Sequence, residues 1–179
     1  MLCSLNFRVL SHMPLRRLQL SASFAHLGAE YERLVQRVLE MEFKTTLERV
    51  GGAGDNGIDI IGNVALSGQE YNLITQCKLK QHGLIPASVI RELDGTVSQR
   101  PNKCVGVIAS NHLLTPQALE TFTKSKFPLI FMQIPNCPRG CESIRAIYAN
   151  RVFKALFPTI NPIKRRSPRG DSITLNLSQ

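Results

Sequence analysis

Residues 57–78 read GIDIIGNVALSGQEYNLITQCK, two apolar segments with turn signals between them at Gly62-Asn63 and Ser67-Gly68. The first segment contains one acid, Asp59, among isoleucines, and the second ends with Gln76, Cys77 and Lys78. Because side chains alternate along a strand, Gln76 and Lys78 lie on the same face of the second segment. A carboxylate within an apolar segment is costly to bury unless it has a partner or a role. We therefore predict two adjacent strands that bring Asp59, Gln76 and Lys78 to one site.

Apolar periodicity predicts helices and further strands on both sides of these two segments. Before them, five apolar residues repeat at helical spacing and predict a helix that ends near residue 43. The five residues are Tyr31, Leu34, Val35, Val38 and Leu39. We expect strands at residues 45–50, 58–61, 71–80, 103–110 and 128–134, and helices at residues 86–96, 115–124 and 143–156. This order predicts an α/β fold with an αβββαβ core, in which helices flank a mixed central sheet.

Length and charge limit the architecture and the partners. The chain has 179 residues, enough for one domain with short tails, and it has no apolar run near the ~20 residues of a membrane span. The formal net charge is +9, but residues 29–150 contain nearly equal numbers of acidic and basic side chains. The excess of positive charge therefore lies in the two tails.

The N-terminal segment, residues 1–27, contains three arginines and no acid, and serine and leucine are common in it. This composition is typical of a mitochondrial transit peptide. A secretory signal needs an unbroken apolar stretch, which the arginines interrupt here. We predict a transit peptide over residues 1–27 and a location in the mitochondrial matrix. A tail without any targeting role is the alternative.

The folded domain is expected to span residues 28–157, followed by a basic, loosely ordered tail at residues 158–179. The tail contains a cluster of four basic side chains that are candidate contacts for nucleic-acid phosphates. They are Lys164, Arg165, Arg166 and Arg169. Cys137 and Cys141 have a loop-like spacing that suits a pair of metal ligands or a disulfide, and we assign neither role.

The polar residues of the predicted site suit the hydrolysis of a phosphodiester. This reaction needs a divalent metal ion that neutralises developing charge and activates water. Mg²⁺ prefers hard oxygen ligands and is commonly held by one or two carboxylates. Asp59 can supply the central carboxylate, Gln76 a neutral carbonyl oxygen, and Glu32 or Glu30 a carboxylate from the first helix. Lys78 can position the attacking water and stabilise the charge of the transition state.

Three spaced motifs lie at Gly28-Ala-Glu-Tyr-Glu32, at residues 54–60 (GDNGIDI) and at Thr75-Gln-Cys-Lys78. They resemble the helix motif G-x-x-[FY]-E, the strand G-x-D-x-G-[IV]-D-[LI] and the strand [VI]-Q-[CV]-K of the Mrr-like PD-(D/E)xK restriction-endonuclease domain. In the third motif Gln replaces the usual acid. The resemblance covers about residues 28–134. It implies a restriction-endonuclease-like fold, metal-dependent cleavage of DNA, and Glu32 as the helix acid.

Together with the basic tails, the whole chain resembles the fungal mitochondrial family called "required for respiratory growth", member seven. The resemblance implies a role in mitochondrial genome maintenance or respiratory growth. The first hypothesis is a Mg²⁺- or Mn²⁺-dependent deoxyribonuclease with catalytic residues Glu32, Asp59, Gln76 and Lys78, of which the first three bind the metal. The second is a catalytically inactive factor that keeps the fold and binds nucleic acid or assists assembly. The sequence leaves open whether the partner is DNA or RNA.

Overall fold

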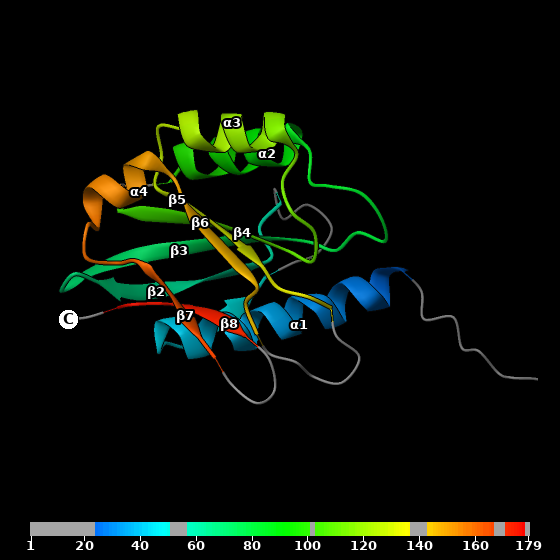
Figure 1. Ribbon diagram of the computed structural model, residues 1–179, viewed down its shortest axis with the longest axis horizontal. Coiled ribbons are helices and arrows are strands. Elements are labelled where there is room, and N and C mark those ends of the chain that lie inside the picture. The colour runs from blue at the N-terminus through cyan, green and yellow to red at the C-terminus, as the bar shows by residue number, and fades with distance from the viewer. Residues whose placement is uncertain (1–23, 51–56, 101–102, 137–142, 167–170, 178–179) are drawn as a thin grey trace, which may run out of the picture.

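The protein is described by a computed structural model over residues 24–50, 57–100, 103–136, 143–166 and 171–177 (Figure 1). The helices are α1 (Phe24–Phe43), α2 (Ala87–Ser98), α3 (Pro116–Lys124) and α4 (Arg151–Leu156). The strands are β1 (Leu47–Arg49), β2 (Ile60–Leu66), β3 (Gln69–Lys78), β4 (Cys104–Ser110), β5 (Leu129–Gln133), β6 (Ala146–Ala149), β7 (Pro162–Arg165) and β8 (Ser172–Leu175).

Strands β1 to β6 form one mixed sheet in chain order. β1, β2 and β3 are antiparallel, β3, β4 and β5 are parallel, and β6 is antiparallel to β5. The parallel strands are connected through α2 and α3, which cover one face of the sheet, whereas α1 covers the other (Figure 1). The predicted α/β class, the αβββαβ order and the mixed sheet flanked by helices are therefore confirmed.

Each face of the sheet carries its own hydrophobic core. On the α1 side, the apolar stripe predicted from periodicity is buried, and the Tyr31 hydroxyl donates to the carbonyl of Ile134 at 2.9 Å. On the other side, Ile90, Leu93 and Phe122 pack onto the sheet. All residues of β4 are buried because helices cover both of its faces.

Two elements near the domain ends differ from expectation. α1 begins at Phe24, so residues 24–27, the end of the predicted transit peptide, belong to the helix, and the transit peptide itself stays a prediction. Residues 1–23 lie outside the described residues. The helix expected at residues 143–156 is strand β6 followed by the short helix α4. Asn150 separates the two elements and caps α4 by accepting a hydrogen bond from the Phe153 amide at 2.9 Å.

The expectation of a loosely ordered tail is also wrong for the described part of residues 158–179. β7 and β8 pair as an antiparallel hairpin, and the Ile173 amide donates to the Ile144 carbonyl at 2.8 Å. Glu42 of α1 accepts hydrogen bonds from the Thr174 hydroxyl and the Leu175 amide. The hairpin therefore packs beside α1 (Figure 1). Cys137, Cys141 and Arg169 lie outside the described residues, so the predictions made for them stay predictions.

Candidate functional site

Asp59 immediately precedes β2, at the end of the sheet where β3 stops. Its amide donates to the Thr75 carbonyl at 2.9 Å, although Thr75 pairs with Ile60 in the β2–β3 ladder. Two successive residues therefore face one residue of β3, which is the pattern of a β-bulge. The Asp59 carboxylate accepts a 2.6 Å hydrogen bond from the Cys77 amide. The bulge thus directs the carboxylate to the backbone between Gln76 and Lys78.

Gln76 is buried at this position without a hydrogen-bond partner for its side chain. It is 1% exposed, and neither Nε2 nor Oε1 has a partner among the described residues. A buried amide normally finds partners, because leaving one unpaired costs about 1–3 kcal/mol. The Thr75 hydroxyl beside it is likewise buried and unpaired within the described part of the chain. Unpaired polar groups of this kind are expected where a ligand completes the bonding.

Lys78 and Glu92 form an ion pair on the same side of the sheet as Gln76. The Lys78 Nζ lies 3.4 Å from the Glu92 Oε2, and Glu92 comes from α2. Gly57 lies beside this group with a φ of +74°. A Cβ atom on Gly57 would lie 2.5 Å from the Glu92 Oε1 and 2.7 Å from the Gln76 Nε2. The positive φ therefore favours glycine there, and a larger residue would also require the ends of the Glu92 and Gln76 side chains to move.

Glu32 is held by a second ion pair on the α1 side. The Arg49 Nη2 of β1 donates to the Glu32 Oε2 at 2.7 Å, and both side chains are largely buried. Burial raises the pKa of the Cys77 thiol well above its ordinary value, and the charges of Asp59 and Glu32 raise it further. The positive charges of Arg49 and Lys78 lower the pKa of the same thiol. Asp59, Glu32, Arg49 and Lys78 are therefore all close enough to Cys77 to influence its thiol.

The segment that carries Lys78 is fixed by polar residues at the end of β4. The Ser110 hydroxyl donates to the Lys78 carbonyl at 2.8 Å. Asn111 accepts from the Lys80 amide at 2.9 Å and donates to the Lys80 carbonyl at 2.7 Å. These bonds extend the β3–β4 pairing beyond the regular ladder and hold the Lys78 backbone in place.

The structure thus brings Asp59, Gln76 and Lys78 together as predicted, and it places Glu32 against Arg49. The described residues contain no group of three His, Cys, Asp or Glu side chains that could hold a metal ion. The predicted donor set consists of two carboxylates and one amide, so a metal here would depend on the unpaired Gln76 carbonyl oxygen. Hard oxygen donors of this type suit Mg²⁺ or Mn²⁺. The metal roles of Glu32, Asp59 and Gln76 stay predictions.

Arg49 and Glu92 are members of the site that the sequence did not reveal. Glu92 follows Arg91 on the exposed flank of a helix, where a glutamate is ordinarily solvated. Arg49 ends a short strand just before a glycine-rich stretch of sequence. Arg49 of β1 is paired with α1, and Glu92 of α2 is paired with β3, so both residues can be assigned to the site only when these tertiary contacts are known. The register of the strands together with α2 would have been needed to find them.

A separate cavity of about 1090 Å³ lies near the C-terminal end of α1. Its lining includes Glu42, Arg165 and Thr174 but none of the site residues described above. It is formed where the β7–β8 hairpin packs beside α1. The cavity is therefore distinct from the end of the sheet that carries the charged cluster, which consists of Asp59, the Glu32–Arg49 pair and the Lys78–Glu92 pair.

Comparison with known proteins identifies a family whose model matches most of the chain. The model of the family described as "Required for respiratory growth protein 7" matches residues 23–73 and 67–156. The chain belongs to this family. The match covers the sheet from β1 to β6 with its helices, including every residue of the charged cluster. Membership in the respiratory growth family is thus established for the part of the chain that carries the site.

Two curated relatives are mitochondrial proteins. An uncharacterized mitochondrial protein of Schizosaccharomyces pombe is 31% identical over 128 residues, which is 70% of this chain and 51% of the relative. The mitochondrial Required for respiratory growth protein 7 of Vanderwaltozyma polyspora is 26% identical over 155 residues, which is 60% of this chain and 62% of the relative. The chain therefore matches between about half and three fifths of the length of these relatives.

Among solved structures, the MspJI restriction endonuclease in complex with a 27-mer oligonucleotide is similar to this family member. The TM-score is 0.45 and the sequence identity is 19%, over 63% of this chain and 29% of that chain. Within the residues that the structure describes, no helix combines the length and the apolar character needed to cross a membrane.

Proposed function

We propose that this member of the respiratory growth family is a metal-dependent nuclease that hydrolyses phosphodiester bonds of DNA in the mitochondrial matrix. The observation that carries the proposal is the buried amide of Gln76, which has no hydrogen-bond partner among the described residues and lies between Asp59 and Lys78 at the end of the sheet. A fold that leaves a buried amide without partners loses stability unless a ligand uses that amide. A divalent cation and its waters are a ligand that matches a carboxylate and an amide oxygen.

Each residue of the site has a defined part in this reaction. When bound, Mg²⁺ or Mn²⁺ would supply Lewis acidity and lower the pKa of a coordinated water. Asp59 and the Gln76 carbonyl oxygen would hold the cation, and Glu32 would join them after leaving Arg49. The Lys78 ammonium would orient the attacking water and offset the negative charge that develops on the phosphate. Arg49, once released by Glu32, would be free to contact a phosphate oxygen.

A second candidate function is a nucleic-acid-binding or assembly factor without turnover. The observation in its favour is that four charged groups of the site are paired with one another. Glu32 is paired with Arg49 at 2.7 Å, and Lys78 is paired with Glu92 at 3.4 Å. These two ion pairs would allow the fold to persist without a metal. The nuclease cleaves nucleic acid when a metal ion is bound, whereas the binding factor cleaves none.

The direct test is a cleavage assay of the full chain with Mg²⁺ or Mn²⁺ on duplex, single-stranded and branched DNA and on RNA. Wild type should cut DNA, and a chelator should stop the reaction. Asp59→Asn keeps the shape of the side chain but removes the charge, so cleavage should fall at least about a hundredfold. Lys78→Ala should also lose cleavage while keeping metal binding, because the ammonium acts on the transition state.

The matched control for the lysine is Lys124→Ala on α3. Lys124 is also paired with a glutamate, Glu120, at 2.5 Å, but it lies outside the site. This variant should cut like wild type. If wild type cuts none of the four substrates with either metal, the nuclease proposal fails and the binding factor remains. If Asp59→Asn cuts as fast as wild type, cleavage in the preparation comes from another source.

Localisation needs its own test because only the relatives are named as mitochondrial. A reporter fused to residues 1–27 should enter the matrix, and a control fusion with Arg8, Arg16 and Arg17 replaced by glutamine should stay outside. A protease-protection assay on isolated mitochondria distinguishes the matrix from the outer surface. A cytosolic reporter would contradict the prediction for the N-terminal segment.

A further inference from the structure

Glu92 shares a neighbour, Gly57, with the Gln76 amide, which has no hydrogen-bond partner among the described residues. One of its oxygens, Oε2, contacts Lys78, whereas the other, Oε1, lies at Gly57. The Cβ position of Gly57 is 2.5 Å from the Glu92 Oε1 and 2.7 Å from the Gln76 Nε2. The two polar atoms therefore face the same small space. A half-turn of the Gln76 amide exchanges its oxygen and nitrogen and would direct Oε1 into that space.

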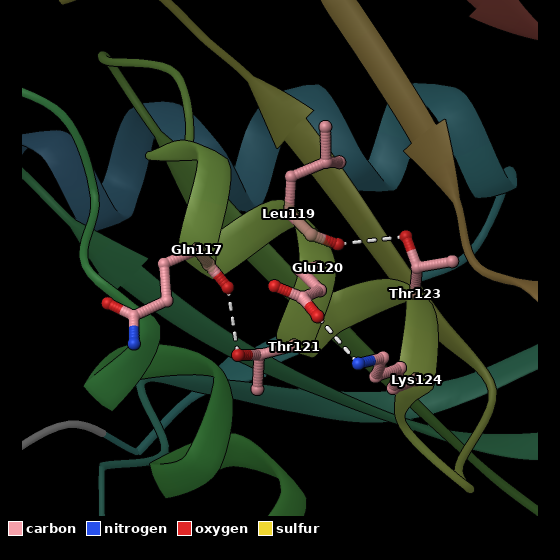
Figure 2. A network of polar contacts seen from close by, with 6 residues as sticks. All are labelled: Gln117, Leu119, Glu120, Thr121, Thr123 and Lys124. Carbon is pink, nitrogen blue, oxygen red and sulfur yellow. Dashed lines mark hydrogen bonds and ion pairs between the residues drawn. The ribbon is translucent and has the colours of Figure 1, made fainter.

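The position of Glu92 differs from that of an ordinary helix glutamate. Glu120 and Lys124 illustrate the ordinary case, because they form an i,i+4 pair on the exposed surface of α3 (Figure 2). Glu92 instead joins α2 to β3, and its second oxygen lies at Gly57, which also adjoins the 1% exposed side chain of Gln76. An exposed pair of the Glu120 type contributes little and has no effect on a distant site.

We propose that Glu92 supplies the second carboxylate of the site and binds the divalent cation together with Asp59 and the Gln76 carbonyl oxygen. This inference rests on the proposed metal dependence. Mg²⁺ and Mn²⁺ sites in proteins typically use one or two carboxylates plus substrate oxygens. Glu32 is held by Arg49 at 2.7 Å, whereas the longer contact with Lys78, 3.4 Å, uses only the Oε2 of Glu92 and leaves its Oε1 at Gly57 to serve as the second acid. The acid missing at position 76 of β3 is thus provided from α2.

The chain offers a charge-relocation test of this assignment. Glu92→Gln removes the carboxylate from α2, Gln76→Glu adds one on β3, and the double variant Gln76→Glu/Glu92→Gln moves the carboxylate from one element to the other. Binding of Mn²⁺ to the full chain is measured by calorimetry, with the metal-induced rise in Tm as a second readout. Glu120→Gln is the matched control, because it removes a helix glutamate that also pairs with a lysine.

Glu92→Gln should weaken Mn²⁺ binding at least about tenfold, and by more than Glu32→Gln does. The double variant should recover affinity to within a few fold of wild type, and Glu120→Gln should bind like wild type. Glu92→Gln and Glu120→Gln should retain the thermal transition of the metal-free protein, since neither changes side-chain size or buries a charge. Gln76→Glu adds a carboxylate at a position that is 1% exposed, so its metal-free Tm should fall, and its Mn²⁺ affinity is measured below that transition. Unaltered Mn²⁺ affinity in Glu92→Gln overturns the proposal, and so does a double variant that binds no better than Glu92→Gln.

The calorimetry separates this proposal from the nuclease function. If wild type binds Mn²⁺ through Glu92 but cuts no nucleic acid, the metal site stands and the nuclease function fails. If wild type cuts DNA and Glu92→Gln binds and cuts equally well, the nuclease function stands and the role of Glu92 fails. If wild type binds no Mn²⁺, the assignment of Glu92 is overturned along with the metal-dependent reaction.

Discussion

Two buried amide side chains, Asn150 and Gln76, have opposite environments in the same fold. Asn150 is 2% exposed and uses its amide fully: Oδ1 accepts from the Leu129 and Phe153 amides, and Nδ2 donates to the Phe122 and Phe127 carbonyls. Gln76 is 1% exposed, and neither of its amide atoms has a partner among the described residues. The same chemical group therefore stabilises one part of the molecule and is left unpaired in another.

The difference separates the structural part of the sheet from the functional part. At Asn150, the amide ties β5, α3 and the start of α4 together, so each bond supports packing. At Gln76, burial costs free energy that the described contacts do not offset. A fold can retain such a residue when a bound ligand completes its hydrogen bonds or coordination. The contrast makes opposite predictions for replacement at the two positions.

The largest expected effect is on stability at Asn150. Asn150→Ala removes four hydrogen bonds and leaves buried backbone groups unpaired, so the free energy of unfolding should fall by about 3 kcal/mol or more. Chemical denaturation of the full chain measures the change. The control is Asn161→Ala, because Asn161 makes one exposed bond to the Pro158 carbonyl. A loss at Asn150 no greater than at Asn161 would contradict the structural role.

Gln76→Met should have the opposite effect on stability. Met has a similar volume and no polar atoms to leave unpaired, so the metal-free variant should be as stable as wild type or about 1 kcal/mol more stable. The same substitution should abolish the rise in Tm that Mn²⁺ produces in wild type, since the amide oxygen is lost. Denaturation without Mn²⁺ measures the stability of the metal-free variant, and thermal denaturation with and without Mn²⁺ measures the metal-induced rise in Tm. A large loss of stability in the metal-free variant would mean that Gln76 is structural like Asn150.

The core elements could be predicted from the sequence because local patterns determine them. The α1 stripe has helical spacing, β4 is a continuous apolar run, and Thr115 with Pro116 marks the start of α3, where the Thr115 hydroxyl accepts from the Ala118 amide. In the site, Asp59 was conspicuous as an acid among isoleucines, and the alternation along β3 placed Gln76 with Lys78. These inferences needed no knowledge of distant contacts.

The remaining features depend on contacts between distant segments. Ile144 and Ile147 fit helical spacing, but pairing with β5 makes residues 146–149 an edge strand. The hairpin β7–β8 is ordered through Ile144 and Glu42, which lie far from it in sequence. Arg49 and Glu92 become part of the site only through Glu32 and Lys78 on other elements. Local propensity contains no information about such pairings.

Two buried hydroxyl groups, on Thr75 and Ser110, differ in the same way as the two amides. The Thr75 hydroxyl is buried and has no partner among the described residues, whereas the buried Ser110 hydroxyl donates to the Lys78 carbonyl. Thr75→Val keeps the shape and removes the unpaired hydroxyl, so stability should rise by roughly 0.5–1 kcal/mol. Ser110→Ala should lower it by a similar amount. Denaturation curves of both variants measure the two changes, and a loss in Thr75→Val would show that its hydroxyl is satisfied in solution.

Glu42 extends the comparison to a charged group that has partners. It accepts hydrogen bonds from Thr174 and Leu175, yet burial raises its pKa above the ordinary value of 4.5, against the lowering effect of those bonds and of Arg165. The folded state therefore binds the proton more tightly than the unfolded state. The resulting stability is fully present below about pH 4.5 and is lost as the pH rises through the elevated pKa.

Glu42→Gln removes this proton-linked contribution and retains an oxygen that can accept from Leu175. The stability of the variant relative to wild type should therefore increase with pH from about 4.5 through the elevated pKa of Glu42 and then level off. Denaturation across a pH series measures this difference, and Glu48→Gln, at an exposed position on β1, is the control for loss of a charge. A difference that stayed constant or fell over that range would show that the bonds to the hairpin outweigh burial, which would place Glu42 with Asn150 among the fully satisfied groups.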